Sequence, residues 1–68
     1  MNITLNGEPE DLPAPLTVTE LLRSLGRDPD TPGVAVAVNL EVLASQDWST
    51  VLVRDGDRVD VVVAVGGG

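Results

Sequence analysis

The first residues alternate between apolar and polar, which is the period of a strand with one buried face. Ile3 and Leu5 are the apolar positions, and the Asn6-Gly7 pair that follows is a strong signal for a two-residue hairpin turn. We expect a second, short strand around residues 10–12. Nearby prolines place it at the edge of a sheet, because proline cannot donate to a strand ladder.

The next segment has the pattern of a helix with well-marked ends. Thr17 and Glu20 have the spacing of a capping box, in which each side chain accepts a hydrogen bond from an otherwise unpartnered amide. The apolar stripe at helical period consists of Val18, Leu21, Leu22 and Leu25. Gly26 then supplies the left-handed residue that commonly closes a helix.

The rest of the chain reads as strands separated by turns. β-Branched residues predict strands over 34–38 and 42–43, and a last strand over 58–65 that follows an Asp-Gly-Asp turn. Residues 45–49 are predicted to form one helical turn that carries Trp48, the only aromatic residue, as a lid over a small core.

This order of elements predicts an α+β fold of the β-grasp type, a mixed sheet of about four to five strands packed on one helix. The first and last strands should be parallel neighbours in the middle of the sheet. We expect one domain over residues 1–65 and a flexible glycine tail over residues 66–68.

Strand parity divides the side chains between two faces of the sheet. The predicted core beneath the sheet consists of Ile3, Leu5, Leu21, Leu22, Leu25, Val36, Val38, Val59, Val61 and Val63. The opposite face should carry Ala35, Ala37, Val62 and Ala64. Small apolar residues that face water close to a chain end indicate a candidate docking surface for a partner protein.

Composition narrows the possible functions. The 68 residues include no Cys and no His, which excludes disulfides, a Cys/His zinc site, and any thiolate nucleophile or imidazole base. The net charge of −7 argues against binding to nucleic acid or to an anionic membrane surface. No apolar stretch is long enough to span a bilayer, and no secretory leader is recognisable, so we expect a cytoplasmic protein that is not itself an enzyme.

The ending Gly66-Gly67-Gly68 carries the candidate reactive group of the chain, its terminal carboxylate. Three residues reach roughly 10 Å when extended, enough to thread a bare main chain into a partner's active site. The terminal carboxylate is ionised at neutral pH, because its pKa is about 3.5. It is therefore an oxygen nucleophile suited to attack the α-phosphate of ATP and form an acyl-adenylate.

Several features together make the chain resemble the sulfur carriers of the ThiS family, which belong to the ubiquitin-like ThiS/MoaD group. These are Asn39 with its apolar-acidic turn, the Asp47-Trp48 pair, the run from Arg54 to Asp57 and the ending from Val63 to Gly68. Gly66 departs from the pattern, since relatives often carry a polar residue before the glycine pair.

The resemblance implies a sequence of partners and assigns all catalytic groups to them. A ThiF-type adenylyltransferase adenylates Gly68, and a sulfur donor such as a cysteine desulfurase persulfide converts the adenylate to a thiocarboxylate. Thiazole synthase of the ThiG type then takes the sulfur during thiamine biosynthesis. Gly66 and Gly67 would thread the tail into these active sites. The carrier itself would need no cofactor and no metal, because ATP is used by the activating enzyme.

Other functions remain open at this stage. The small subunit of molybdopterin synthase, or another ubiquitin-like sulfur carrier, would use the same tail chemistry with a different acceptor. A hypothesis from another class is a non-catalytic protein-interaction module whose tail is inert.

Overall fold

A computed structural model describes residues 1–64, so Val65 and the glycines at positions 66–68 lie outside the described residues. The elements are β1 (Asn2–Leu5), β2 (Glu8–Asp11), β3 (Leu16–Thr17), α1 (Val18–Ser24), β4 (Val34–Val38), β5 (Glu41–Leu43), the 3-10 turn η1 (Ser45–Asp47), β6 (Leu52–Val53) and β7 (Arg58–Val63).

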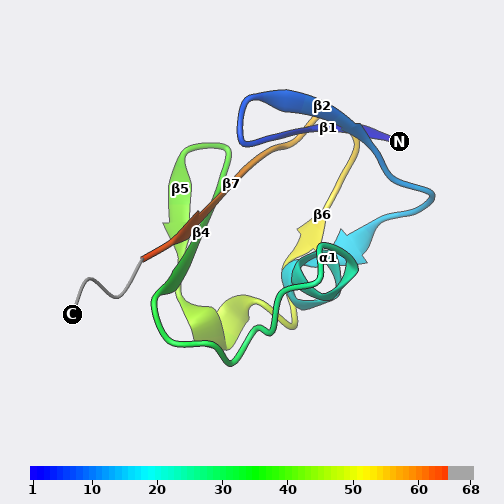
Figure 1. Cartoon of the computed structure of the whole chain (residues 1–68). Helices are drawn as coiled ribbons and strands as arrows, with labels where there is room; N and C mark the ends of the chain where they lie inside the picture. The colour runs from blue at the N-terminus through cyan, green and yellow to red at the C-terminus, as the bar shows by residue number, and fades with distance from the viewer. Residues whose placement is uncertain (65–68) are drawn as a thin grey trace.

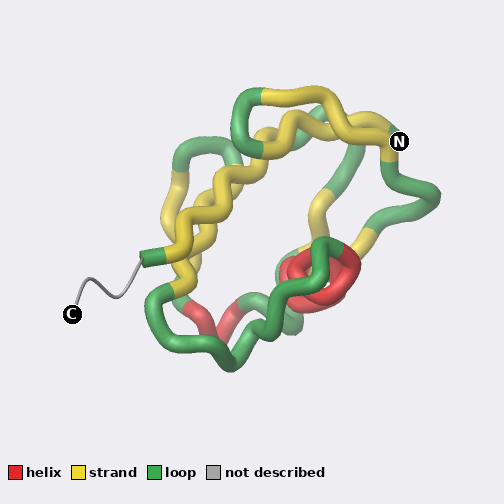
Figure 2. Tube along the Cα trace, in the orientation of Figure 1, coloured by secondary structure: helices red, strands yellow, loops and turns green. Residues whose placement is uncertain are grey.

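Five strands form one mixed sheet in the order β2-β1-β7-β4-β5 (Figure 1). β1 and β7 run parallel, and the other neighbours are antiparallel. The helix lies on one side of this sheet, with the long connections passing around it (Figure 2). The predicted β-grasp architecture and the central position of β7 are therefore confirmed.

The helix begins where its sequence predicts. Thr17 Oγ1 accepts from the amide of Glu20 at 3.1 Å, and Glu20 Oε1 accepts from the amide of Thr17 at 2.9 Å. The hydrogen bond from the Thr17 backbone amide to the Glu20 carboxylate and, second, the Thr17 side chain lower the pKa of Glu20 below its ordinary value. Gly26 follows the helix with a φ of 76°, which confirms its predicted left-handed conformation.

The core lies between the helix and the inner face of the sheet. The buried apolar residues are Ile3, Leu12, Val18, Leu21, Leu22, Val36, Trp48, Val53 and Val59. Leu5, Val38 and Val61 of the predicted core pack against this cluster while partly buried, and Val63 is also half-buried. The placement of Trp48 over the core is confirmed, since its side chain is only 4% exposed.

Leu25 is the one predicted core residue that the structure places outside. The helix ends at Ser24, and Leu25 occupies the C-cap with a φ of −86° and a ψ of 3°. Its amide still donates to the carbonyl of Leu21 at 3.1 Å, but its side chain, just past the last helical residue, is 39% exposed. The apolar period alone does not reveal that the helix stops one residue earlier.

A second sheet of two short strands, β3 and β6, was not predicted. Leu16 pairs with Val53, and Thr17 pairs with Leu52. The chain before β6 also supplies acceptors to the first turn of the helix, because the amide of Val18 donates to the carbonyl of Val51 at 3.1 Å. Strands of two residues have no readable period, so only the folded chain reveals this pairing.

Candidate functional site

The central strand β7 carries the chain towards its final glycines. At the end of β7, Val63 pairs with Val34, and the amide of Ala64 donates to the carbonyl of Gly33 at 2.8 Å. Gly33 has a φ of 86°, and a β-carbon there would lie 3.2 Å from the β-carbon of Ala64. The close approach and the left-handed backbone both favour glycine at position 33. The root of the tail is thus held by backbone contacts to the segment before β4.

The outer face of the sheet, defined here as Ala35, Ala37, Val62 and Ala64, lies opposite the helix. Val62 is 61% exposed and stands directly across from Ala35 on the neighbouring strand. Ala35 and Ala64 are exposed, and Ala37 is half-buried. The structure therefore places Ala35, Ala37 and Val62 on one face, while Ala64 is exposed just beyond the end of β7.

Two further apolar residues near this face were missed by the sequence analysis. Val42 on β5 pairs with Ala37 and is 75% exposed. Leu40, in the turn between β4 and β5, is 74% exposed. Val42 could have been found by extending the strand alternation across the hairpin, because residues that stand opposite each other share a face. Leu40 carried no such signal, because turn residues follow no strand period.

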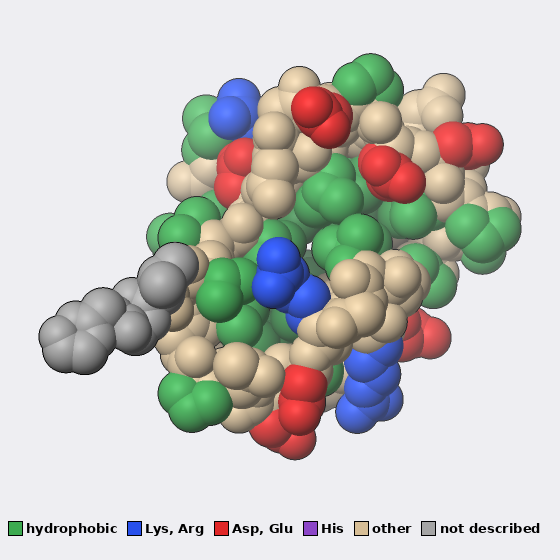
Figure 3. All heavy atoms as spheres, viewed as in Figure 1, with side chains coloured by type: hydrophobic (Ala, Val, Ile, Leu, Met, Phe, Trp, Pro, Cys, Tyr) green, Lys and Arg blue, Asp and Glu red, His purple; other side chains and the backbone are tan. Residues whose placement is uncertain are grey.

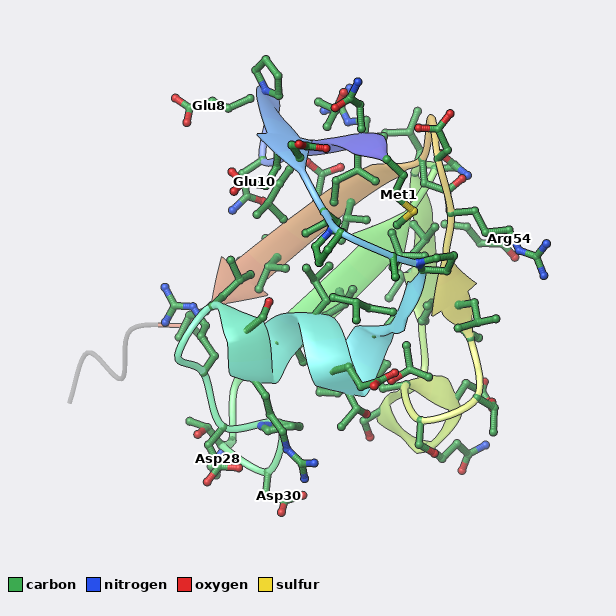
Figure 4. All side chains as sticks on the ribbon, turned by 90° about the vertical axis from the view of Figure 1, so that its right-hand side faces the viewer. Met1, Glu8, Glu10, Asp28, Asp30 and Arg54 are labelled. Carbon is green, nitrogen blue, oxygen red and sulfur yellow. The ribbon has the colours of Figure 1, made fainter. Side chains whose placement is uncertain are left out.

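Charged side chains surround the apolar surfaces. On the outer side of β7, Arg58 Nε and Asp60 Oδ2 form an ion pair at 3.0 Å. In Figure 4, Glu8, Asp28 and Asp30 extend away from the body of the molecule, whereas Met1 points inward. Figure 3 shows acidic groups around the periphery of one side, with apolar side chains gathered between them. An acidic periphery of this kind steers association towards basic partner surfaces.

A polar cleft lies between the helix, the loop before β4 and η1. Its lining includes Thr19, Arg23, Ser45, Trp48 and Ser49. The indole N–H of Trp48 has no acceptor among the residues that the structure describes. The hydroxyls in this cleft have no imidazole base to activate them, since the chain contains no His.

Over residues 1–64 there is no group of three or more acidic side chains placed to hold a metal ion. Within the same residues, α1 is far shorter than a membrane crossing requires, and no other helix reaches that length. The sequence-predicted sites Gly66, Gly67 and Gly68 lie outside the described residues, so their role remains a prediction.

Comparison with known proteins identifies the family. A model of the ThiS family matches residues 3–68, a span that includes the three final glycines. The chain belongs to the ThiS family. It is 32% identical over 68 residues to the sulfur carrier protein ThiS of Escherichia coli K12, and the match covers the whole of both chains.

A solved ThiS structure supports the same conclusion at the level of fold. The crystal structure of the thiamine biosynthesis protein ThiS from Geobacter metallireducens superposes with a TM-score of 0.84. The two chains are 38% identical, and each is covered completely.

Two longer relatives have a different name. The chain is 40% identical to a segment of thiazole synthase from Paramagnetospirillum magneticum and 38% identical to a segment of thiazole synthase from Magnetococcus marinus. In each case all 68 residues align, and they span 20% of the longer protein.

Proposed function

We propose that this ThiS-family chain is a sulfur carrier of thiamine biosynthesis, and that the carboxyl group of Gly68 carries the sulfur. The observation that carries the proposal is the family match, which extends through the final glycines to residue 68. The whole-length similarity to the sulfur carrier of Escherichia coli supports the same role. In this role the protein is a co-substrate, and the catalytic groups belong to its partners.

The first chemical step joins the tail to ATP in a ThiF-type adenylyltransferase. An oxygen of the Gly68 carboxylate attacks the α-phosphorus, the bond to the β-phosphate oxygen breaks, and pyrophosphate leaves. The outer sulfur of a protein persulfide, such as that of a cysteine desulfurase, then displaces AMP from the acyl carbon. A thiol reduces the resulting acyl disulfide and leaves the thiocarboxylate. The first of these steps consumes ATP, so we expect the carrier to work in the cytoplasm.

Thiazole synthase of the ThiG type is the proposed acceptor of the sulfur. Two proteins named thiazole synthase contain a segment similar to this entire chain. Joining a carrier to the enzyme that it serves raises the local concentration of the carrier at the active site. This observation favours thiazole synthase over molybdopterin synthase as the partner.

The outer face supplies the docking surface in this proposal. Val62 lies on the strand that leads to the tail, Ala64 follows the end of that strand, and Ala35 lies beside Val62 on the next strand. A partner that holds the tail in its active site therefore meets this apolar surface first. Val62→Asp should raise the KM of the activating enzyme for the carrier, because a carboxylate would have to be desolvated in the contact.

Deletion of Gly67 and Gly68 tests the role of the tail. ATP–pyrophosphate exchange with the cognate adenylyltransferase should be abolished, while the urea midpoint should stay unchanged because the last few residues of most domains contribute little to packing. Gly67→Ala should lower the exchange rate by about a hundredfold, since small misplacements at a reacting centre have effects of that size. Gly66→Ala is the matched control and should be tolerated best.

Intact-mass measurement completes the test. Wild-type protein incubated with ATP, the adenylyltransferase and a persulfide donor should gain the mass difference between sulfur and oxygen. Exchange that persists in the truncated protein would show that the tail is not the reactive group, and the carrier function would then be rejected.

A further inference from the structure

Leu40 has an unfavourable backbone conformation that the fold does not explain by packing. It is the second residue of the two-residue turn between β4 and β5, with a φ of 69°. A β-carbon makes this left-handed region unfavourable, and only Gly, Asn and Asp visit it routinely. The side chain of Leu40 is 74% exposed, so burial does not offset the strain.

The geometry of this turn is held by its first residue, Asn39. Its amide donates to the carbonyl of Arg58 at 2.7 Å, and its Oδ1 accepts from the amide of Arg58 at 2.9 Å. Its Nδ2 donates to Asp57 Oδ1 at 3.1 Å. These contacts fix the turn without any contribution from the Leu40 side chain. A strained residue that the fold does not need points to a role outside the fold.

Val42 extends the exposed apolar surface of the same hairpin. It is 75% exposed, and with Leu40 it makes the two most exposed large apolar side chains among residues 1–64. Val42 stands opposite Ala37, so the hairpin tip continues the outer face. The tip lies at the end of β4 opposite to Gly33, where the tail is rooted (Figure 1).

The separation of the tip and the tail root suits a single partner. The six residue steps from Gly33 to Asn39 span roughly 20 Å of extended chain. A standard protein interface covers roughly 800 Å² on each partner, a patch roughly 30 Å across. One protein can therefore hold the tail at one end of the outer face and the hairpin tip at the other.

We propose that Leu40 and Val42 form a second anchor for the adenylyltransferase, inserted into an apolar recess with a cationic rim on that enzyme. This inference rests on the proposed function above. The expected cationic rim follows from the charge at the tip: Glu41 is exposed there, and the nearby Arg58 is already paired with Asp60. A second copy of this chain is a poor occupant, because both copies carry a net charge of −7.

Contacts at both the tail and the hairpin tip would help to align the tail carboxylate for the reaction. Attack on the α-phosphorus requires the tail carboxylate to be aligned with a fixed ATP molecule. A tail alone leaves the body of the carrier free to swing about its root. The anchor at Leu40 and Val42 restricts that rotation, so Leu40 acts as a positioning residue and not as a catalytic one.

Leu40→Asn distinguishes a role in partner binding from a role in the fold. The variant should be more stable than the wild type but should bind the adenylyltransferase more weakly. Asparagine accepts the left-handed backbone, so the thermal midpoint should rise by about 4 °C. The KM for the carrier in ATP–pyrophosphate exchange should rise about tenfold because the apolar contact is lost, and kcat should fall as well because the tail carboxylate is no longer held in alignment. Leu40→Gly should show the same split.

Leu52→Asn is the matched control, since Leu52 is 42% exposed on β6, in the other sheet. Its KM should equal that of the wild type. An unchanged KM in both Leu40 variants would contradict the proposed second anchor. Exchange activity of the wild type would still support the carrier function in that case. A midpoint that falls in both variants would contradict the strain on which the inference depends. Failure of the wild type to support exchange would reject the proposed function and the anchor together.

Discussion

The molecule contains two hairpin turns of the same design and different chemistry. Asn6-Gly7 connects β1 to β2, and Asn39-Leu40 connects β4 to β5. The φ values are 50° and 81° in the first turn and 51° and 69° in the second, as a type I′ turn requires. In both turns the Asn side chain accepts from an amide of β7, Asn6 from Val61 at 2.7 Å and Asn39 from Arg58 at 2.9 Å.

The difference between the turns lies in what stabilises them. Asn-Gly favours the type I′ conformation on its own, so the first turn is specified locally. Leu40 disfavours it, and the second turn depends on the contacts of Asn39 with Arg58 and Asp57. Both turns are therefore held by contacts of their Asn residue with β7, but only the first also has the local preference of a glycine, and only the second leaves an exposed apolar residue at its tip.

Removing the Asn side chains should give the largest effect. Asn39→Ala loses two side-chain hydrogen bonds and the left-handed tolerance of Asn, and we expect it to lower the free energy of unfolding by about 2 kcal/mol. Asn6→Ala loses the same left-handed tolerance but only one side-chain hydrogen bond, so its loss should be smaller by about 1 kcal/mol. Urea denaturation of both variants measures the difference. An equal or greater loss for Asn6→Ala would contradict the distinction between the turns.

Gly7→Leu makes the first turn resemble the second. A β-carbon at Gly7 would have no atom within 4 Å, so only the backbone strain of a φ of 81° opposes the change. We expect a loss of about 1 kcal/mol by urea denaturation, the strain being partly offset by the lower entropy of the unfolded chain. The sign should be opposite to that of Leu40→Gly. If Gly7→Leu and Leu40→Gly changed the free energy of unfolding in the same direction, backbone strain at the second turn position would not explain the effects.

The helix start offers a third, smaller test of local specification. The pKa of Glu20 is lowered in the folded protein, so its stabilising contribution is present above its ordinary pKa and is lost as the pH falls through the folded pKa. Glu20→Gln keeps the capping hydrogen bonds without the titration. Between about pH 5 and pH 3, the wild type should lose slightly more stability than this variant. Parallel pH curves for the two proteins would argue against the capping contact of the carboxylate.

Patterns within a few residues of each other predicted much of the fold. The capping box at Thr17 and Glu20, the Asn6-Gly7 turn and the alternation in β4 and β7 are all local signals, and the structure confirms each of them. The pairing of β3 with β6 and the exposure of Leu25 were not predicted, because they depend on where distant segments meet.

The candidate site also has a part that was predicted from local patterns and a part that was not. Strand parity placed Ala35, Ala37, Val62 and Ala64 on one face; the structure places the first three there, and Ala64 lies beyond the end of β7. The outward extension of this face to Leu40 and Val42 was missed, since nothing near Leu40 in the sequence indicates that its turn is held by Asp57 and Arg58.

The sequence by itself determined the elements, the acidic surface and the glycine ending, because propensity, charge and backbone freedom belong to individual residues and their near neighbours. Only the tertiary structure decided which apolar residues stay exposed and which strained turn is tolerated. Those outcomes depend on contacts between residues far apart in the chain, such as the 18 positions that separate Asn39 from Asp57. Burial and hydrogen bonding across such distances form together on folding, and no local pattern encodes them.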